Sequence, residues 1–261
     1  MDTERFERAV SLRDAGDPRE AARQFHILAN DAADSVERAM ILLNESTCLC
    51  QMGNTAAARK CWLEASSLVP KESEFRPSIE DQEAFILVTE DRTQEALEIL
   101  DRIVAKYGNL LARNDKRHLY ERIQINRGSH LVYLGRFSDA RPLLEEALSF
   151  DEAIKGARFY YDLGLMYFNL NKFPQSKGHF ETALKMGLRD GWGGQAHYYL
   201  GVIYAREGAL ARAKNELELS LQEAGTSKLS KQDIYARLAA VCTALGLHEQ
   251  AQTYRQLMNN G

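Results

Sequence analysis

The sequence predicts an all-α fold, an α-solenoid in which antiparallel helix pairs stack one after another. A short apolar motif containing glycine occurs twice, 37 residues apart. Small residues recur in register along the whole chain, and a residue that tolerates a left-handed backbone stands in the middle of every repeat. A period of roughly 20–50 residues is the sequence signature of repeat proteins, so these observations favour a solenoid.

The repeated motif sets the register of the prediction. Residues 163–167 (Leu-Gly-Leu-Met-Tyr) recur at 200–204 (Leu-Gly-Val-Ile-Tyr), and each copy precedes a turn and a second amphipathic segment. Extended along the chain, this register predicts helix-pair units at 2–34, 38–70, 77–108, 120–153, 156–189, 193–225 and 231–260. Because a single helix pair buries too little surface to fold alone, we expect one continuous domain over 1–261.

One small residue stands at an equivalent place in each predicted helix. A small side chain lets a partner helix approach closely, so these positions mark where the helices of a unit cross. In the first helices they are Ala9, Ser46, Ala84, Gly128, Gly164, Gly201 and Ala239. In the second helices they are Ala21, Ala58, Ala96, Ala140, Ser176, Ala213 and Ala251. The first-helix positions are 37, 38, 44, 36, 37 and 38 residues apart, so we expect long loops between units, with extra loop residues after the third unit, near 107–115.

The turn between the two helices of each unit has its own signal. Residues that tolerate positive φ end a helix readily, and each unit has one. They are Gly16, Gly53, Asp91, Gly135, Asn171, Gly208 and Gly246. After the first, Asp17 and Pro18 predict an N-cap and a first helical residue, with Glu20 completing a capping box. Phe173 and Pro174 start another second helix in the same way.

These features together resemble the tetratricopeptide repeat family. The Leu-Gly-x-x-Tyr core is present, as is the step from Ala to an aromatic residue, at Ala21 to Phe25 and again at 58–62. Pro70 stands where the closing proline of that family belongs. The resemblance covers nearly all of the chain. It implies a right-handed superhelix whose first helices line a concave surface, on which ligands bind as extended segments or helices.

Composition excludes several classes of protein. No run of eighteen apolar residues exists and the chain starts with charged residues, so we expect neither a membrane span nor a signal peptide. The cysteines Cys48, Cys50, Cys61 and Cys242 form no disulfide framework and read as core residues, which favours the cytoplasm. Polar residues replace apolar ones in the end units, at Arg5 and Arg255 for example, so we expect a monomer with capped ends.

We find no arrangement of residues that predicts catalysis, a cofactor or a metal ion, so we expect no enzyme. The six histidines form no ligand or catalytic pattern, and Cys48 and Cys50 point in different directions on a helix. The stretch 191–194 (Gly-Trp-Gly-Gly) lacks the spacing of a phosphate-binding loop and reads as a loop between units.

The predicted concave face offers a candidate binding site for a protein or peptide. Helical spacing places polar residues of three successive first helices on stripes that we expect to lie side by side. The stripes are Arg122, Asn126 and Tyr133, then Arg158, Asp162 and Asn169, then Gln195, Tyr199 and Arg206. Guanidinium groups bind carboxylates, amides pair with a peptide backbone and tyrosines supply contact area, so this mixture suits a peptide.

Chaperone adaptors of this family hold a terminal carboxylate with a clamp of Lys, Asn, Asn, Lys and Arg. Arg122 and Asn126 match its first two members, but Asp162, Gln195 and Tyr199 do not match the rest, so we do not expect that ligand here.

Two alternatives to an adaptor or scaffold remain open. One is a peptide-sensing regulatory module, as in bacterial signalling proteins of this family. The other is an RNA-binding solenoid, for which Arg113, Lys116, Arg117, Arg122 and Arg127 would form a basic patch. The net charge of −4 weighs against nucleic acid.

Overall fold

A computed structural model describes residues 2–188, 191–223 and 229–259. Over these residues the chain forms fourteen α-helices and no strand, which confirms the all-α prediction. It divides into two compact units, unit 1 (Met1–Leu134) and unit 2 (Gly135–Gly261), which are described separately below.

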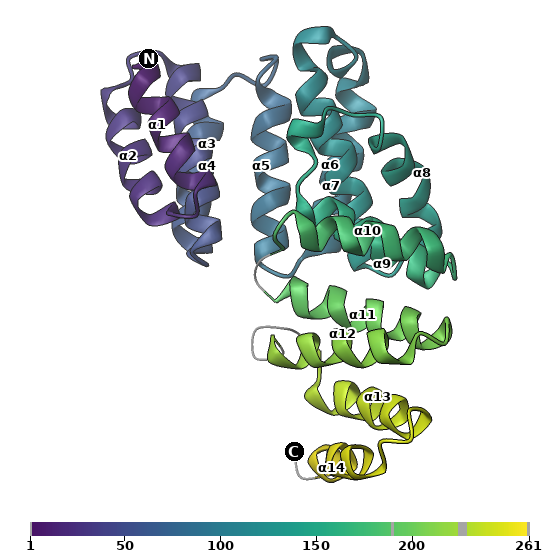
Figure 1. Ribbon diagram of the computed structural model, residues 1–261. Coiled ribbons are helices and arrows are strands. Elements are labelled where there is room, and N and C mark those ends of the chain that lie inside the picture. The colour runs from purple at the N-terminus through teal and green to yellow at the C-terminus, as the bar shows by residue number, and fades with distance from the viewer. Residues whose placement is uncertain (1, 189–190, 224–228, 260–261) are drawn as a thin grey trace. The chain divides into compact units, whose positions relative to one another are not determined.

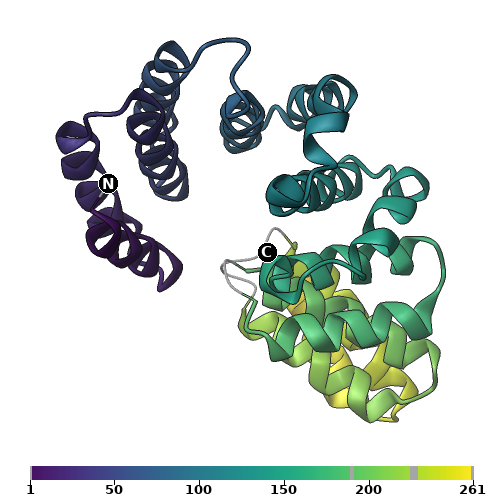
Figure 2. The same cartoon turned by 90° about the horizontal axis from the view of Figure 1, so that it is seen from above.

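Unit 1 contains seven helices, which follow one another along an arc (Figures 1 and 2). They are α1 (Thr3–Asp14), α2 (Pro18–Asp31), α3 (Ser35–Gln51), α4 (Thr55–Leu68), α5 (Arg76–Thr89), α6 (Thr93–Leu111) and α7 (Arg117–Tyr133). The short 3-10 helix η1 (Asn114–Lys116) precedes α7. Each of the first three pairs is an antiparallel hairpin whose helices pack on each other and on the next pair.

Unit 2 contains the other seven helices, α8 (Phe137–Ala147), α9 (Ala157–Asn169), α10 (Phe173–Lys185), α11 (Trp192–Arg206), α12 (Leu210–Gln222), α13 (Lys231–Ala244) and α14 (His248–Asn259). The 3-10 helix η2 (Glu152–Ile154) lies between α8 and α9. The last three hairpins stack in sequence, α10 on α11 and α12 on α13.

All fourteen predicted small residues are buried, and two of the glycines lie directly at helix crossings. A Cβ added to Gly164 in α9 would lie 2.7 Å from Cδ1 of Phe180 in α10, and one added to Gly201 in α11 would lie 2.6 Å from Cγ of Leu217 in α12. Where serine takes the place of glycine or alanine, its hydroxyl bonds the facing helix. The hydroxyl of Ser176 donates to the carbonyl of Gly164 at 2.8 Å.

All seven predicted turn residues adopt the left-handed backbone. The non-glycine members show it most clearly, since Asp91 has φ 62° and Asn171 has φ 59°. Asp17 caps α2 as predicted, and its carboxylate accepts a hydrogen bond from the backbone N–H of Glu20 at 3.1 Å. The capping box is incomplete, however, because the carboxylate of Glu20 bonds Arg23 and Gln24 instead.

Two local predictions were wrong. The stretch 191–194 is not a loop, because Gly191 (φ 77°) is the N-cap of α11 and the next three residues are helical. Glu223, which follows α12, packs against both glycines, and the contact is tightest in its fixed part at Gly194, where an added Cβ would lie 3.0 Å from Cβ of Glu223. The extra residues after the third hairpin do not form a long loop either. They extend α6 past a kink at Tyr107 to the buried Leu111.

Separate apolar clusters fill the two units. In unit 1 Phe25 and Ile41 lie in the cluster of the first hairpins, with Cys48 beside them. In unit 2 Phe180 and Leu200 lie between α10 and α11. The prediction that the cysteines are core residues is confirmed for Cys48, Cys50 and Cys242, while Cys61 is partly buried against the first cluster.

Candidate functional site

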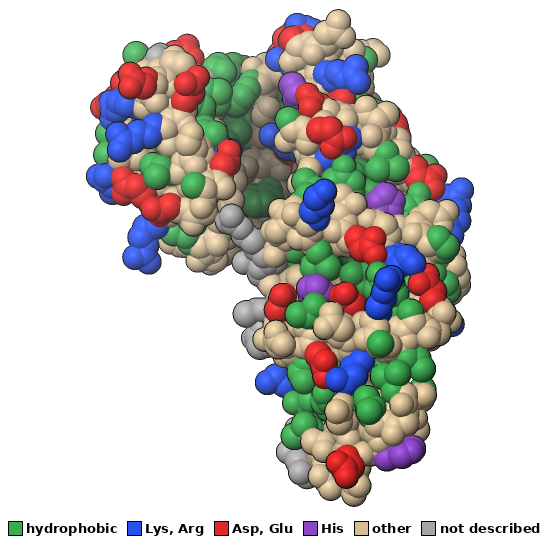
Figure 3. Space-filling view, viewed as in Figure 1, with side chains coloured by type: hydrophobic (Ala, Val, Ile, Leu, Met, Phe, Trp, Pro, Cys, Tyr) green, Lys and Arg blue, Asp and Glu red, His purple; other side chains and the backbone are tan. Residues whose placement is uncertain are grey.

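A cavity of about 430 Å³ lies in unit 1. Its walls come from the first helix of each successive pair, namely α1, α3, α5 and α7, as the resemblance implied for the concave surface. The space-filling view shows this face hollowed between α1–α4 and the helices α5 to α7, with hydrophobic side chains on its walls (Figure 3). The lining combines polar and apolar side chains from helices far apart in the sequence.

Two of the predicted site residues, Arg122 and Asn126 of α7, line this cavity. They stand six and two residues before the small residue of their helix. The residues at the same offsets in the two preceding first helices also line the cavity. These are Met40 and Asn44 in α3, and Ser78 and Gln82 in α5. These four residues lie outside the predicted stripes, which came from later helices only, although their shared offset from the small residue identifies them.

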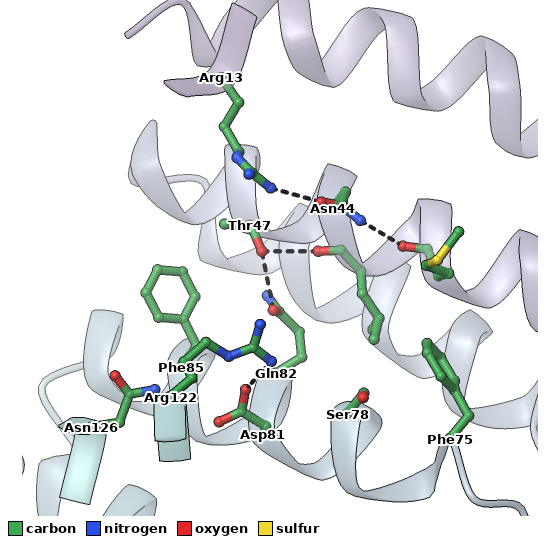
Figure 4. A pocket seen from close by; sticks show the side chains of 12 residues that line it. Arg13, Asn44, Thr47, Phe75, Ser78, Asp81, Gln82, Phe85, Arg122 and Asn126 are labelled. Carbon is green, nitrogen blue, oxygen red and sulfur yellow. Dashed lines mark hydrogen bonds and ion pairs between the residues drawn. The ribbon is translucent and has the colours of Figure 1, made fainter. Parts of the chain in front are cut away.

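Most polar groups of the cavity are already held by hydrogen bonds. Arg13 of α1 donates to the side-chain oxygen of Asn44 at 2.7 Å (Figure 4). The amide of Gln82 donates to the hydroxyl of Ser46 and accepts from Thr47, both at 3.1 Å. These bonds connect α1 to α3 and α3 to α5, so they order the wall before any ligand arrives.

Arg122 is paired with a buried carboxylate. Its Nη2 lies 2.7 Å from Oδ2 of Asp81, a residue that is only 7% exposed, whereas the Arg122 side chain is 54% exposed. The other carboxylate oxygen, Oδ1, is buried and has no hydrogen-bond partner among the described residues. Asp81 therefore depends on Arg122 for compensation of its charge, and Arg122 has a structural role whatever it binds.

Two polar side chains of the cavity, those of Asn126 and Ser78, have no hydrogen-bond partner within the described parts of the chain. The amide of Asn126 is half-buried in the wall beside Arg122 (Figure 4). Apolar side chains complete the lining, among them Phe75, the N-cap residue of α5, and Phe85 within that helix. Phe85 is 37% exposed. The cavity thus offers an unpaired amide next to accessible aromatic surface.

Tyr133, the third residue of the first predicted stripe, does not line the cavity. It lies at the end of α7, where it is exposed and donates a hydrogen bond from its hydroxyl to Asp91 at 2.8 Å. This bond joins α7 to the turn before α6. Tyr133 therefore supports the hairpin packing of unit 1 at the place where we expected a ligand contact.

The second predicted stripe is divided between core and surface in unit 2. Asp162 is fully buried, not exposed as expected, and its Oδ1 accepts from Nε of Arg158 at 2.8 Å. The guanidinium of Arg158 also stacks over the ring of Trp192 at 3.6 Å. Asn169 is exposed and bonds the carbonyl of Leu165 in its own helix. The structure does not bring these residues together on one open face.

The third stripe is also mainly structural. Gln195 accepts a hydrogen bond from the hydroxyl of Tyr161 at 2.9 Å. Tyr199 stacks on Phe180 with ring centroids 5.4 Å apart, and burial raises the pKa of the Tyr199 hydroxyl. Arg206 alone is exposed. Tyr199 therefore packs between α11 and α10 and contributes to the core.

The cations of the predicted basic patch are paired with carboxylates. Arg113 bonds Glu74 at 2.6 Å, Arg117 bonds Glu121 at 2.7 Å and Arg127 bonds Asp101 at 2.6 Å. Lys116 lies 3.6 Å from Asp115, and Arg122 pairs with Asp81. These pairs largely cancel the local positive field that a phosphate backbone would need.

The sequence profile of the tetratricopeptide repeat family matches residues 125–176 and 161–227. The chain contains tetratricopeptide repeats. Solved structures agree with the fold. PilF of Pseudomonas aeruginosa superposes with a TM-score of 0.63 at 18% identity, covering 85% of this chain and 90% of PilF.

Two larger solved structures are similar over almost the whole chain. The complex Cut9-Hcn1 of the APC/C gives a TM-score of 0.68 at 15% identity over 96% of this chain. A signal-transduction ATPase of Pyrococcus horikoshii with a tetratricopeptide repeat sensor gives 0.65 at 16% identity over 98%. The chain spans only 44% and 41% of these two proteins. No characterised protein matches it in sequence.

Tetratricopeptide-repeat proteins are in general non-catalytic modules for protein–protein interaction, and the fold supports that broad function here. In the described part of the chain no group of three His, Cys, Asp or Glu side chains could hold a metal ion. No described helix has both the length and the hydropathy needed to cross a lipid bilayer.

Proposed function

We propose that this tetratricopeptide-repeat protein is a scaffold or adaptor that binds an extended segment of a partner protein in the cavity of unit 1. One observation carries the proposal. The side-chain amide of Asn126 has no hydrogen-bond partner among the described residues, in a cavity where most other polar side chains are held by hydrogen bonds. A primary amide donates and accepts at once, so it complements the N–H and C=O groups of a peptide backbone.

The rest of the lining suits the same ligand. Phe75 and Phe85 give an apolar surface for a side chain of the segment, and aromatic residues supply much of the binding free energy at protein interfaces. The wall is preordered by the bonds of Arg13 and Gln82, which lowers the entropy lost on binding. Ordering a flexible segment still costs roughly 2–5 kcal/mol, so we expect a Kd in the micromolar range.

A library of displayed peptides, selected on the purified chain, would provide ligands for the test. Their Kd would then be measured by fluorescence anisotropy for two cavity variants. Asn126→Ala should weaken binding about two- to tenfold, because it removes one hydrogen-bonding group. Ser78→Trp should abolish binding, because Ser78 lines the cavity and the indole would occupy it.

Asn109→Ala and Asn109→Trp are matched controls. Asn109 is exposed on α6, a second helix of the same unit, and does not line the cavity. Both controls should bind like the unmodified chain. Equal binding by the cavity variants and the controls would refute the proposal. Arg122→Glu is less informative, since it would set a second carboxylate against the buried Asp81 and weaken the fold.

The two alternatives receive less support from the molecule. The five cations of the predicted RNA-binding patch all pair with acidic side chains. A regulatory module that senses peptides would use the same cavity in unit 1, so the peptide measurements apply to it as well.

A further inference from the structure

A second cavity, of about 390 Å³, lies in unit 2. Its walls come from α9, α11 and α13, the first helices of three successive hairpins, and from Leu217 of α12. Every lining residue belongs to unit 2, so this site is separate from the cavity of unit 1. Only Arg206 among the predicted site residues lines it.

Two arginines line this cavity from different helices, Arg206 of α11 and Arg237 of α13. Both are exposed. Within the described residues neither forms an ion pair. The guanidinium of Arg206 lies 4.6 Å above the ring of Phe173, and Nε of Arg237 is 3.5 Å from the hydroxyl of Tyr198. Neutral aromatic neighbours thus orient both cations without neutralising them.

The surface between the two arginines is apolar. Phe168, Val202 and Val241 line it, and Leu217 lies where α11 and α12 cross at Gly201. The only charged side chains that line the cavity are the two arginines, so its charge is positive in a chain whose net charge is −4. A positively charged surface attracts negatively charged groups of a ligand, and the apolar centre adds affinity for a hydrophobic side chain.

From this arrangement we infer that the unit 2 cavity binds an acidic segment of another protein, with an apolar side chain flanked by carboxylates. Each guanidinium would bind one carboxylate, and the apolar side chain would lie between them against Val202 and Val241. This site does not depend on the function proposed for unit 1, since the two cavities share no residue.

A blocked, fluorescein-labelled peptide of repeated Glu-Leu-Glu-Gly is a direct probe of this chemistry. Three variants of this peptide separate the contributions of charge and of apolar contact. Two carry Gln or Lys in place of Glu, and the third carries Ala in place of Leu. Anisotropy titrations should give the tightest binding for the Glu-Leu peptide, and the Gln and Ala peptides should bind at least about fivefold more weakly. Raising NaCl from about 50 to about 500 mM should weaken the Glu-Leu peptide several-fold, because salt screens exposed charge pairs.

Substitutions locate the site. The double variant Arg206→Gln/Arg237→Gln should weaken the Glu-Leu peptide about tenfold, because two charge-assisted contacts are lost. Arg212→Gln is the matched control and should change the Kd less than about twofold. Arg212 is exposed on α12 and lies over the ring of Tyr204, but it does not line the cavity.

A charge-reversed variant is a second test, because the double Gln variant could also bind poorly through a change in local structure. Arg206→Glu/Arg237→Glu should lose the Glu-Leu peptide and gain the Lys-Leu peptide. Circular dichroism should show unchanged helix content. The inference is overturned if the double Gln variant binds the Glu-Leu peptide like the unmodified chain, or if the reversed variant gains no affinity for the Lys-Leu peptide. Asn126→Ala, in unit 1, should leave all these affinities unchanged.

Discussion

Gly164 occupies a position where a side chain has no room. The ring of Phe180 would lie 2.7–2.9 Å from an added Cβ, and Phe180 is completely buried, so it has little freedom to move. Gly178, in the next helix α10, is the opposite case. It is exposed within the helix and nothing lies within 4 Å of an added Cβ.

We therefore expect opposite effects from the same substitution at these two glycines. Gly164→Ala should lower the free energy of unfolding by about 1–3 kcal/mol through overpacking. Gly178→Ala should raise it by about 0.5–1 kcal/mol, because alanine loses less backbone entropy in a helix. Urea denaturation followed by circular dichroism measures both. A loss of similar size at both sites would contradict this account of the crossing.

His179 gives the fold a dependence on pH. Its ring stacks on Tyr167 with centroids 5.4 Å apart, and burial lowers the pKa of the imidazole below its usual value. The unfolded chain therefore takes up the proton at a higher pH than the folded chain. Stability should be unaffected above about pH 7 and should fall as the pH drops through about 6.5, the ordinary pKa of histidine.

Urea denaturation of the unmodified chain and of His179→Gln, between about pH 8 and pH 5, tests this prediction. The variant should be less stable at pH 8, where it loses the stacking contact, but it should lose less stability on acidification. A variant with the same pH dependence as the unmodified chain would assign the effect to other groups.

At the scale of elements, the turns decide where each helix ends. Five of the seven predicted turns have glycine at the left-handed position, whereas the third and fifth have Asp91 and Asn171. Asp91 also accepts the hydrogen bond of Tyr133, which gives it a second role. The Asn171 side chain forms no hydrogen bond with any described residue, so its conformational strain can be measured separately from other contacts.

We expect Asn171→Gly to raise the free energy of unfolding by about 0.5–1 kcal/mol, because glycine adopts φ near 59° without steric strain. Gly208→Asn, at the equivalent turn between α11 and α12 (φ 76°), is the reciprocal change and should lower it by a similar amount. Thermal denaturation followed by circular dichroism measures both. If both substitutions changed the free energy of unfolding in the same direction, the turn geometry would not be what limits stability.

At the scale of the whole molecule, stability should vary along the stack. In repeat proteins each hairpin is stabilised mainly by its neighbours. The last helix, α14, packs against α13 and buries a single residue, Ala251. By contrast, α10 packs against both α9 and α11 and buries Phe180 among others.

Amide hydrogen exchange should therefore be at least about tenfold faster in α14 than in α10, because local opening of α14 exposes less apolar surface. Exchange is carried out on the intact chain, and mass spectrometry after digestion then measures the exchange rate in each helix. Equal protection of the two helices would show that unit 2 opens only as a whole.

Local and periodic features of the chain were sufficient to predict the helices, the turn residues and the places where helices cross. They are visible in the sequence because a positive φ or a close helix contact restricts which residue can stand there. The partners of polar side chains are not visible in this way. Arg122 bonds Asp81, 41 residues earlier in the chain, and no local sequence pattern predicts that pair.

Asn126 and Asp162 show where that limit lies, since both stand two residues before the glycine of a first helix. The sequence by itself determined that both occupy the same place in the repeat. Only the tertiary structure decided that Asn126 lines an open cavity while Asp162 is fully buried against Arg158. The reason is that helical spacing fixes the direction of a side chain along its own helix, whereas its exposure depends on how closely the neighbouring helices pack around it.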